Sequence, residues 1–324
     1  MTKITTIVTA HNHCEFLDDC LDSCKQIDGD LFVYITGNNH EPHKIAEKYT
    51  SNIKYLSFAN DFSKIKNKII QDTESEWLFF IESNEKIIRG KEDIQNLCNN
   101  PNIYRVNLIQ ESIITKPIRL WNKNKNLQFQ NPVYESIKSE GLCTNIFLQN
   151  NTVDNFDLNK ELLNLWQQKT PFAIEPLYYK SCLYLTKFQW DDFINTANEY
   201  LFKENKRKAS YVMTKYYLGF VFCHIKKDYQ KAIKCVIECL SLKPIMAEFW
   251  CLLGDIYYAL DNFHKAYSFY ENAKLLGSRR LKNDEWPFHI DKYKTYPESM
   301  MNNCQDILKK NKTIFSKRYL NHSQ

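Results

Sequence analysis

The stretch FWCLLGDIYYALDNFHKAYSFYENAKLLG, residues 249–277, decides the fold of the C-terminal half of the chain. Large apolar residues recur in it at the spacing of two amphipathic helices. Gly254, Ala266 and Ala273 supply small residues where paired helices approach most closely. The stretch therefore predicts a pair of packed helices.

The same pattern occurs one period earlier, in YYLGFVFCHIKKDYQKAIKCVIECLSLKP (216–244). Ala232 and Ala266 occupy equivalent positions and lie 34 residues apart, which is the repeat length of a tetratricopeptide repeat (TPR). A weaker unit at 177–201 precedes these two. Since about three repeats are needed to bury a continuous core, the pattern predicts an all-α TPR domain.

The first half of the chain alternates short β-rich runs with amphipathic stretches, as β-α-β units do. After Arg89 the runs are extended and no long helix separates them, so we expect the sheet to finish with antiparallel strands. We place the boundaries at 1–150 for an α/β domain, 151–170 for a linker, 171–280 for the TPR helices and 281–324 for a C-terminal cap and polar tail. The expected strands are 4–10, 30–37, 53–58 and 76–82, and the expected helices 15–26, 42–49 and 61–71.

Composition and charge narrow the class of protein. The net formal charge of +5 arises from 43 basic and 38 acidic residues spread along the chain, which argues against a nucleic-acid partner. The sequence contains no run of about 18 apolar residues, so it predicts no transmembrane segment, and its N-terminus is unlike a signal peptide. The eleven scattered cysteines are expected to be reduced thiols. These features predict a cytoplasmic protein.

Four motifs in the first half occur in the order found in one enzyme family: IVTAHNHCEFLDDCLDSC (7–24), NDFSKIKNKII (60–70), EWLFFIESNE (76–85) and IRLWNKNKNLQFQNPVYESI (118–137). Together they resemble the family-two glycosyltransferases, in particular a branch in which the catalytic domain precedes TPR helices. The resemblance implies a GT-A fold, a Rossmann-like α/β nucleotide-diphospho-sugar transferase domain.

The resemblance also implies a donor site at the carboxyl ends of the strands, where ligands of open α/β sheets bind. Asp61 would accept hydrogen bonds from a base or ribose, and Lys66 would place a positive charge near phosphate. Without the resemblance, Lys66 is more simply a solvated helix lysine. The complete set of expected donor-binding residues is Thr9, Ala10, Asn12, Thr36, Asp61, Lys66, Asn67 and Arg119.

In the family an acidic motif after the fourth strand binds a divalent cation, manganese or magnesium, that bridges the two phosphates of the donor. Glu82 and Asn84 stand at its two ligand positions. Glu135 is the first candidate for the catalytic base or a carboxylate beside the metal, and Glu85 is the second.

Three departures weaken the expected chemistry. Asn84 is a neutral amide where the family has a carboxylate, so metal affinity should fall. Ile35 replaces an Asp suited to hydrogen-bonding the nucleoside, and Tyr134 replaces a His. The acidic motif is therefore degenerate in composition.

Three functions remain open. The first is a hexosyltransferase-type enzyme that moves a sugar, with inversion and metal assistance, from a nucleotide-sugar donor to a protein, peptide or glycan acceptor held by the TPR groove. The second is a degenerate, inactive glycosyltransferase-like domain in a TPR binding or scaffold protein. The third is a TPR interaction protein with another kind of nucleotide-binding domain. Fold likeness by itself does not choose among them.

Overall fold

A computed structural model of the chain describes residues 3–12, 14–153, 155–277, 279–280, 284 and 286–321, and the side chains of all of these except residues 277 and 312–321. It has two compact units. The first comprises Met1–Pro171 with Glu285–Pro287, and the second comprises Phe172–Asp284 with Phe288–Gln324. The ends of the expected cap and tail, at 281–283 and 322–324, lie outside the described residues.

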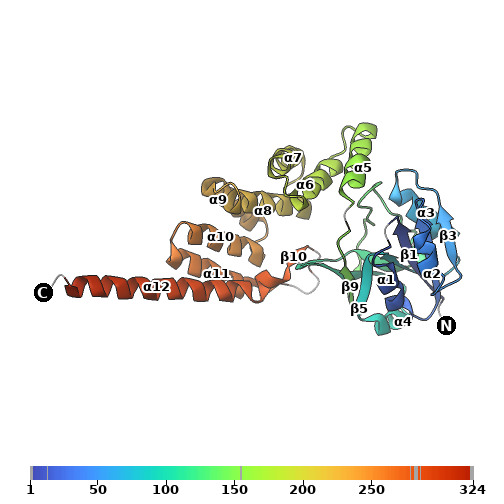
Figure 1. The fold of residues 1–324 in the computed structure, drawn as a ribbon, viewed down its shortest axis with the longest axis horizontal. Coiled ribbons are helices and arrows are strands. Elements are labelled where there is room, and N and C mark those ends of the chain that lie inside the picture. Colours follow the sequence, from blue (N-terminus) through green and yellow to red (C-terminus); the bar gives the residue numbers. More distant parts are fainter. Residues whose placement is uncertain are drawn as a thin grey trace. The chain divides into compact units, whose positions relative to one another are not determined.

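The first unit is built around a twisted sheet with strand order β7-β6-β8-β4-β1-β2-β3, shown in Figure 1 in blue to green. Strand β1 pairs in parallel with β2 and β4, and β2 pairs in parallel with β3. The strands are β1 (Ile4–His11), β2 (Asp30–Thr36), β3 (Ile53–Leu56), β4 (Trp77–Glu82), β5 (Glu85–Arg89), β6 (Ile103–Gln110), β7 (Ile113–Thr115), β8 (Ile118–Asn122) and β9 (Leu142–Asn150).

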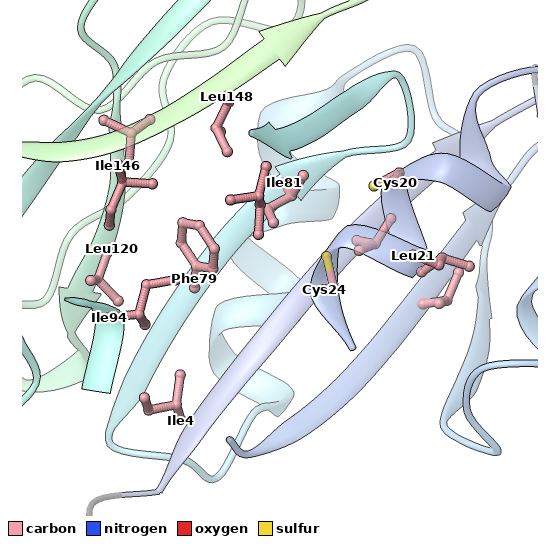
Figure 2. Close-up of a cluster of buried hydrophobic side chains, with 14 of the residues drawn as sticks. Ile4, Cys20, Leu21, Cys24, Phe79, Ile81, Ile94, Leu120, Ile146 and Leu148 are labelled. Atoms are coloured by element: carbon pink, nitrogen blue, oxygen red, sulfur yellow. The ribbon is translucent and has the colours of Figure 1, made fainter. Parts of the chain in front are cut away.

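Strands β4 and β1 are buried on both faces, which explains why WLFFIE reads as a continuous apolar run. Phe79 and Ile81 point to one face, where they pack with side chains of α1 and β9 (Figure 2). Leu78 and Phe80 point to the other face, toward Ile69 of α3. This two-residue alternation places an apolar core on each side of the sheet.

Five α-helices and two 3-10 helices complete the described part of this unit. Helix α3 begins after Asp61, whose carboxylate caps it by accepting from the backbone N–H of Lys64 at 3.1 Å. The α-helices are α1 (Leu17–Cys24), α2 (Glu41–Ala46), α3 (Phe62–Asp72), α4 (Ile94–Leu97) and α5 (Phe156–Lys169), and the 3-10 helices are η1 (Lys91–Asp93) and η2 (Lys123–Lys125).

The strands after Arg89 form the antiparallel pairs β6–β7 and β6–β8, and β8 also pairs antiparallel with β4, as expected. The pair β6–β9 is parallel, which the sequence pattern did not indicate. The stretch expected to be a linker contains helix α5, which belongs to the first unit. This helix was not expected because polar residues predominate in the stretch, although Leu162 and Leu163 form a buried apolar face.

The second unit is helical, and its successive helices pack in pairs (Figure 1, green to red). The pairs α6–α7, α8–α9 and α10–α11 correspond to the three expected repeats. The helices are α6 (Glu175–Thr186), α7 (Trp190–Lys203), α8 (Ala209–His224), α9 (Tyr229–Leu242), α10 (Ala247–Ala259), α11 (Phe263–Gly277) and α12 (Tyr296–Asn321), with β10 (Phe288–His289) and the 3-10 helix η3 (Ile290–Tyr293) between the last two.

The small residues of the repeats lie where the sequence pattern placed them. A Cβ at Gly254 would lie 2.5 Å from Cε1 of Tyr270 on the partner helix, and one at Gly219 would lie 3.1 Å from Cβ of Cys235. Ala266 and Ala273 are fully buried. Close approach within each pair thus depends on these positions. Among the described residues, no helix has the length and apolar character needed to cross a membrane.

Candidate functional site

A pocket of about 330 Å³ opens in the first unit where β1, β2 and β4 end at their carboxyl sides. It lies where ligands of open α/β sheets bind. Among its lining residues are nine of the twelve expected site residues: Thr9, Ala10, Thr36, Lys66, Glu82, Asn84, Glu85, Arg119 and Glu135. The fold therefore gathers these nine side chains around one cavity, while their functional roles stay a prediction.

Ion pairs organise one wall of this pocket. The ammonium group of Lys66 contacts Oε1 of Glu82 and lies 2.5 Å from Oε1 of Glu135. The guanidinium group of Arg119 lies 2.5 Å from Oε1 of Glu85 and 3.5 Å from Oε1 of Glu82. We call these five side chains the charge cluster. With three carboxylates and two cations, its formal charge is −1 when every group is ionised.

The local structure explains how the five side chains meet. Glu82 ends β4 and Glu85 begins β5, and the turn between them is closed because Glu85 Oε2 accepts from the backbone N–H of Glu82 at 2.9 Å. Arg119 extends from β8, the antiparallel neighbour of β4. Lys66 reaches the cluster from α3. Glu135 comes from the segment between η2 and β9. Three strands of the sheet, one helix and this connecting segment are thus needed to place the charges.

Burial makes these contacts strong. The side chains of Lys66 and Glu85 are 4% and 1% exposed, whereas that of Glu82 is 28% exposed toward the pocket. A buried charge without a partner would be strongly disfavoured, so each cation here depends on its carboxylates. Thr9 adds a hydrogen bond by donating its hydroxyl to Glu82 Oε2 at 2.6 Å.

The pKa values follow from this competition between burial and charge. Burial acts to raise the pKa of Glu82, but the charges of Lys66 and Arg119 outweigh it and lower that pKa to about 2. Burial acts to lower the pKa of Lys66, but Glu135 and Glu82 raise it above the ordinary value. Burial raises the pKa of Glu85, and Arg119 only partly offsets this. Lys66 and Glu82 are therefore both charged at neutral pH.

The carboxylates and amides around the pocket are better placed to pair with Lys66 and Arg119 than to bind a divalent metal ion. Lys66 lies between Glu82 and Glu135, the two carboxylates that would face a metal in the pocket. The side-chain amide of Asn84 donates to Asn150 Oδ1 at 2.7 Å and to the carbonyl of Asn151 at 2.8 Å. In the part of the chain that the structure describes, no group of three or more His, Cys, Asp or Glu side chains is placed to hold a metal.

Three expected donor-binding residues are not among the residues that line the pocket, and their side chains make structural hydrogen bonds. Asp61 caps helix α3. The side chain of Asn67 makes two hydrogen bonds with the backbone of Phe129, at 2.8 and 2.9 Å. Asn12 has a φ of 54°, and its Oδ1 accepts from the backbone N–H of Asn38 at 3.3 Å. Each contact supports the structure of the loops or helix around the pocket.

The pocket also has lining residues outside the expected set of site residues. His11, at the end of β1, shares a 2.9 Å hydrogen bond between its Nδ1 and Thr36 Oγ1. Asn159 of α5 donates to the hydroxyl of Tyr134 at 3.3 Å. In the sequence, Asn159 lies in a polar stretch, and that stretch predicted a loop. The contribution of α5 to the pocket wall was therefore not expected.

A family model for the tetratricopeptide repeat matches residues 247–276, which cover α10 and nearly all of α11. A TPR repeat-containing protein of Synechococcus elongatus is 21% identical over 144 residues, 42% of this chain and 36% of that protein. The chain thus spans about a third of the length of this relative.

Solved structures of the protein MamA also match, with low overall similarity. One is 16% identical, with a TM-score of 0.35, and covers 49% of this chain and 92% of that one. Another, from Desulfovibrio magneticus RS-1, is 18% identical, with a TM-score of 0.34, and covers 48% of this chain and 85% of that one. The chain contains a tetratricopeptide repeat, in a helical C-terminal unit that follows a strand-rich sheet.

Proposed function

We propose that this chain is a protein-binding scaffold: its TPR helices bind a protein or peptide partner, and its first unit is a degenerate glycosyltransferase-like domain without metal-assisted transferase activity. The observation that carries the proposal is the position of Lys66. Its ammonium group occupies the space between Glu82 and Glu135, where the family resemblance would place a divalent cation.

The charge cluster explains why metal assistance would be lost. A divalent cation offsets the charge that builds on a departing diphosphate, and it needs carboxylate oxygens that are free to bind it. Lys66 and Arg119 already neutralise two of the three carboxylate charges. Glu135, the candidate base, is itself engaged by Lys66. Ile35, Asn84 and Tyr134 replace further residues that the chemistry would use.

The binding role is supported by the repeats themselves. TPR arrays stack helix pairs into extended surfaces, and such surfaces are widely used to bind other proteins. Residues 247–276 match the repeat family, and three helix pairs are present in the second unit.

The test is a calorimetric titration of the full chain with UDP, GDP and CMP, each with and without Mn²⁺, followed by assays for donor hydrolysis and sugar transfer. We expect no binding that depends on Mn²⁺ and no turnover. Nucleotide binding that requires Mn²⁺ and is lost in Glu82→Ala would refute the proposal.

A second candidate is an active inverting glycosyltransferase that moves a sugar from a nucleotide donor to a protein, peptide or glycan. Two observations favour it: nine of the expected residues line one pocket, and the buried Nε of Arg119 has no hydrogen-bond partner among the described residues. A phosphate oxygen is a suitable acceptor for such a donor. Transfer that persists in excess EDTA and is lost in Glu135→Gln would establish this candidate, with Lys66 and Arg119 in place of a bound Mn²⁺ or Mg²⁺.

A further inference from the structure

The second unit contains a stretch of chain that lies along its own repeat helices. Residues 288–296, which form β10, η3 and the first residue of α12, contact α8 and α10, the first helices of two successive repeats. We call this stretch the return segment. Helix α12, which continues from it, packs against α11.

Two buried carboxylates on α10 receive hydrogen bonds from the return segment. Glu248 is fully buried, and its two oxygens accept from the backbone N–H of His289 at 2.8 Å and from the hydroxyl of Tyr293 at 2.6 Å. Asp255, two turns further along α10, accepts from the hydroxyl of Tyr296 at 2.6 Å. The segment thus supplies a backbone donor and two phenol donors to one helix.

The two acceptors lie at a fixed distance from each other, which the donors of an incoming chain would have to match. Glu248 and Asp255 are seven residues apart, which separates them by about 10.5 Å along one side of a helix. Asp255 is held in place by a second phenol, because Tyr270 of α11 donates to the same Oδ1 at 2.7 Å. Its other oxygen lies 3.4 Å from Nε2 of His224 on α8. The acceptors therefore belong to the packed helices and not to the return segment.

Further contacts of the segment resemble those of a bound peptide. The hydroxyl of Tyr217 on α8 and Nε2 of His289 share a hydrogen bond of 3.0 Å. The guanidinium group of Arg280 lies 4.5 Å from the ring centre of Phe288 and 5.4 Å from that of Tyr293. The segment thus contributes a backbone N–H donor from its extended part, two phenol groups, and an aromatic ring that contacts a cation.

We propose that the face formed by α8 and α10 is a peptide-binding site, that the return segment is its intramolecular occupant, and that its partner is a tyrosine-bearing peptide whose phenol and backbone N–H groups bind Glu248 and Asp255. The inference rests on the protein-binding role proposed above, and it specifies the site and the chemistry of the ligand. A tethered occupant is present at millimolar effective concentration, so a partner must displace it.

The test uses the full chain and a fluorescein-labelled peptide with the sequence of residues 286–297, WPFHIDKYKTYP. The double variant Tyr293→Phe/Tyr296→Phe loses two phenol donors but retains both rings. We expect the labelled peptide to bind this variant about tenfold or more tightly than it binds the wild type, as measured by fluorescence anisotropy. The same peptide with Phe at both tyrosine positions should bind the variant at least about tenfold more weakly, since it lacks the donors.

Tyr211→Phe is the matched control. It removes a phenol-to-carboxylate bond of the same kind, 2.7 Å from Tyr211 to Glu238, between α8 and α9. We expect it to leave peptide binding at the wild-type level. Equal peptide binding by wild type, double variant and control would overturn the inference.

Hydrogen exchange of the wild-type chain gives a second measurement that needs no variant. The amide of His289 should exchange through a local opening, faster than the amides inside α10. Exchange of both only through global unfolding would also overturn the inference. Sugar transfer by the chain would refute the proposed scaffold function and leave the peptide result unchanged, so the two failures are distinguishable.

Discussion

Replacing Lys66 with Ala tests whether this residue takes the place of a metal ion. The change removes the ammonium group that lies between Glu82 and Glu135 and leaves two carboxylates facing each other near the pocket. Removing one partner of a buried ion pair costs about 3–5 kcal/mol of unfolding free energy. Because Glu82 is 28% exposed and can regain water, we expect a loss near the lower limit, about 3 kcal/mol.

The same variant should acquire a response to Mn²⁺. With the ammonium group gone, two carboxylates and the hydroxyl of Thr9 are available as oxygen ligands. If the variant binds Mn²⁺ with a Kd of about 1 mM, then about 5 mM MnCl₂ restores about 1 kcal/mol of the lost stability. Urea unfolding with and without MnCl₂ measures both quantities, and the wild type should show no gain.

Lys64→Ala is the matched control, since Lys64 lies on the same helix, is 80% exposed and makes one ion pair of 3.7 Å with Asp61. We expect it to change stability by no more than about 0.5 kcal/mol and to be insensitive to Mn²⁺. Stabilisation of the wild type by Mn²⁺ to the same degree as Lys66→Ala would refute the reasoning. A loss in Lys66→Ala no greater than in Lys64→Ala would refute it as well.

Three further predictions concern stability. The pKa of Glu82 is lowered to about 2 from an ordinary 4.5, so its ionisation contributes stability that is present above pH 4.5 and lost as pH falls toward 2. Glu82→Gln should therefore destabilise the fold by at most about 3 kcal/mol at pH 6, and urea titrations should show a smaller loss at pH 3. A loss that stays constant with pH would contradict this. Gly254→Ala should lower stability by about 1–3 kcal/mol despite the better helix propensity of Ala, because the added methyl meets the ring of Tyr270. Gly219→Ala has more room and should cost less stability, as measured by thermal unfolding. The reverse order of the two losses would be inconsistent with the packing. Asp61→Ala should cost about 0.5–2 kcal/mol through loss of the α3 cap, whereas an unchanged urea midpoint would show that the cap contributes nothing.

Much of the architecture could be read from local sequence. The TPR helix pairs follow from a repeat in which Gly254 and Ala266 sit at fixed offsets, and the family match to residues 247–276 confirms the repeat. The buried strand 77–82 follows from a continuous apolar run. Helix α5 was missed because its polar residues outnumber the few, such as Leu162, that face the core. The GT-A assignment of the first unit stays a prediction.

The candidate site could be predicted only as a set of residues. Motif order indicated that Glu82, Lys66 and Arg119 belong to one pocket, and the fold gathers them there. Sequence could not show that Lys66 pairs with the two carboxylates that were expected to face a metal. Nor could it show that residues 288–296 lie on α8 and α10, since that stretch has no periodicity that marks an intramolecular ligand.

By itself the sequence determined the two kinds of structure in this chain, an α/β domain with a mixed sheet followed by TPR helices, because hydrophobic periodicity and repeat length are properties of neighbouring residues. Tertiary structure alone decided how the charges are used. Lys66, Glu82 and Glu135 come from separate parts of the chain, and ion pairing depends on distances of a few ångströms between buried groups. Whether a carboxylate faces a lysine or a metal ion is therefore settled only when the helix and the strands have packed together.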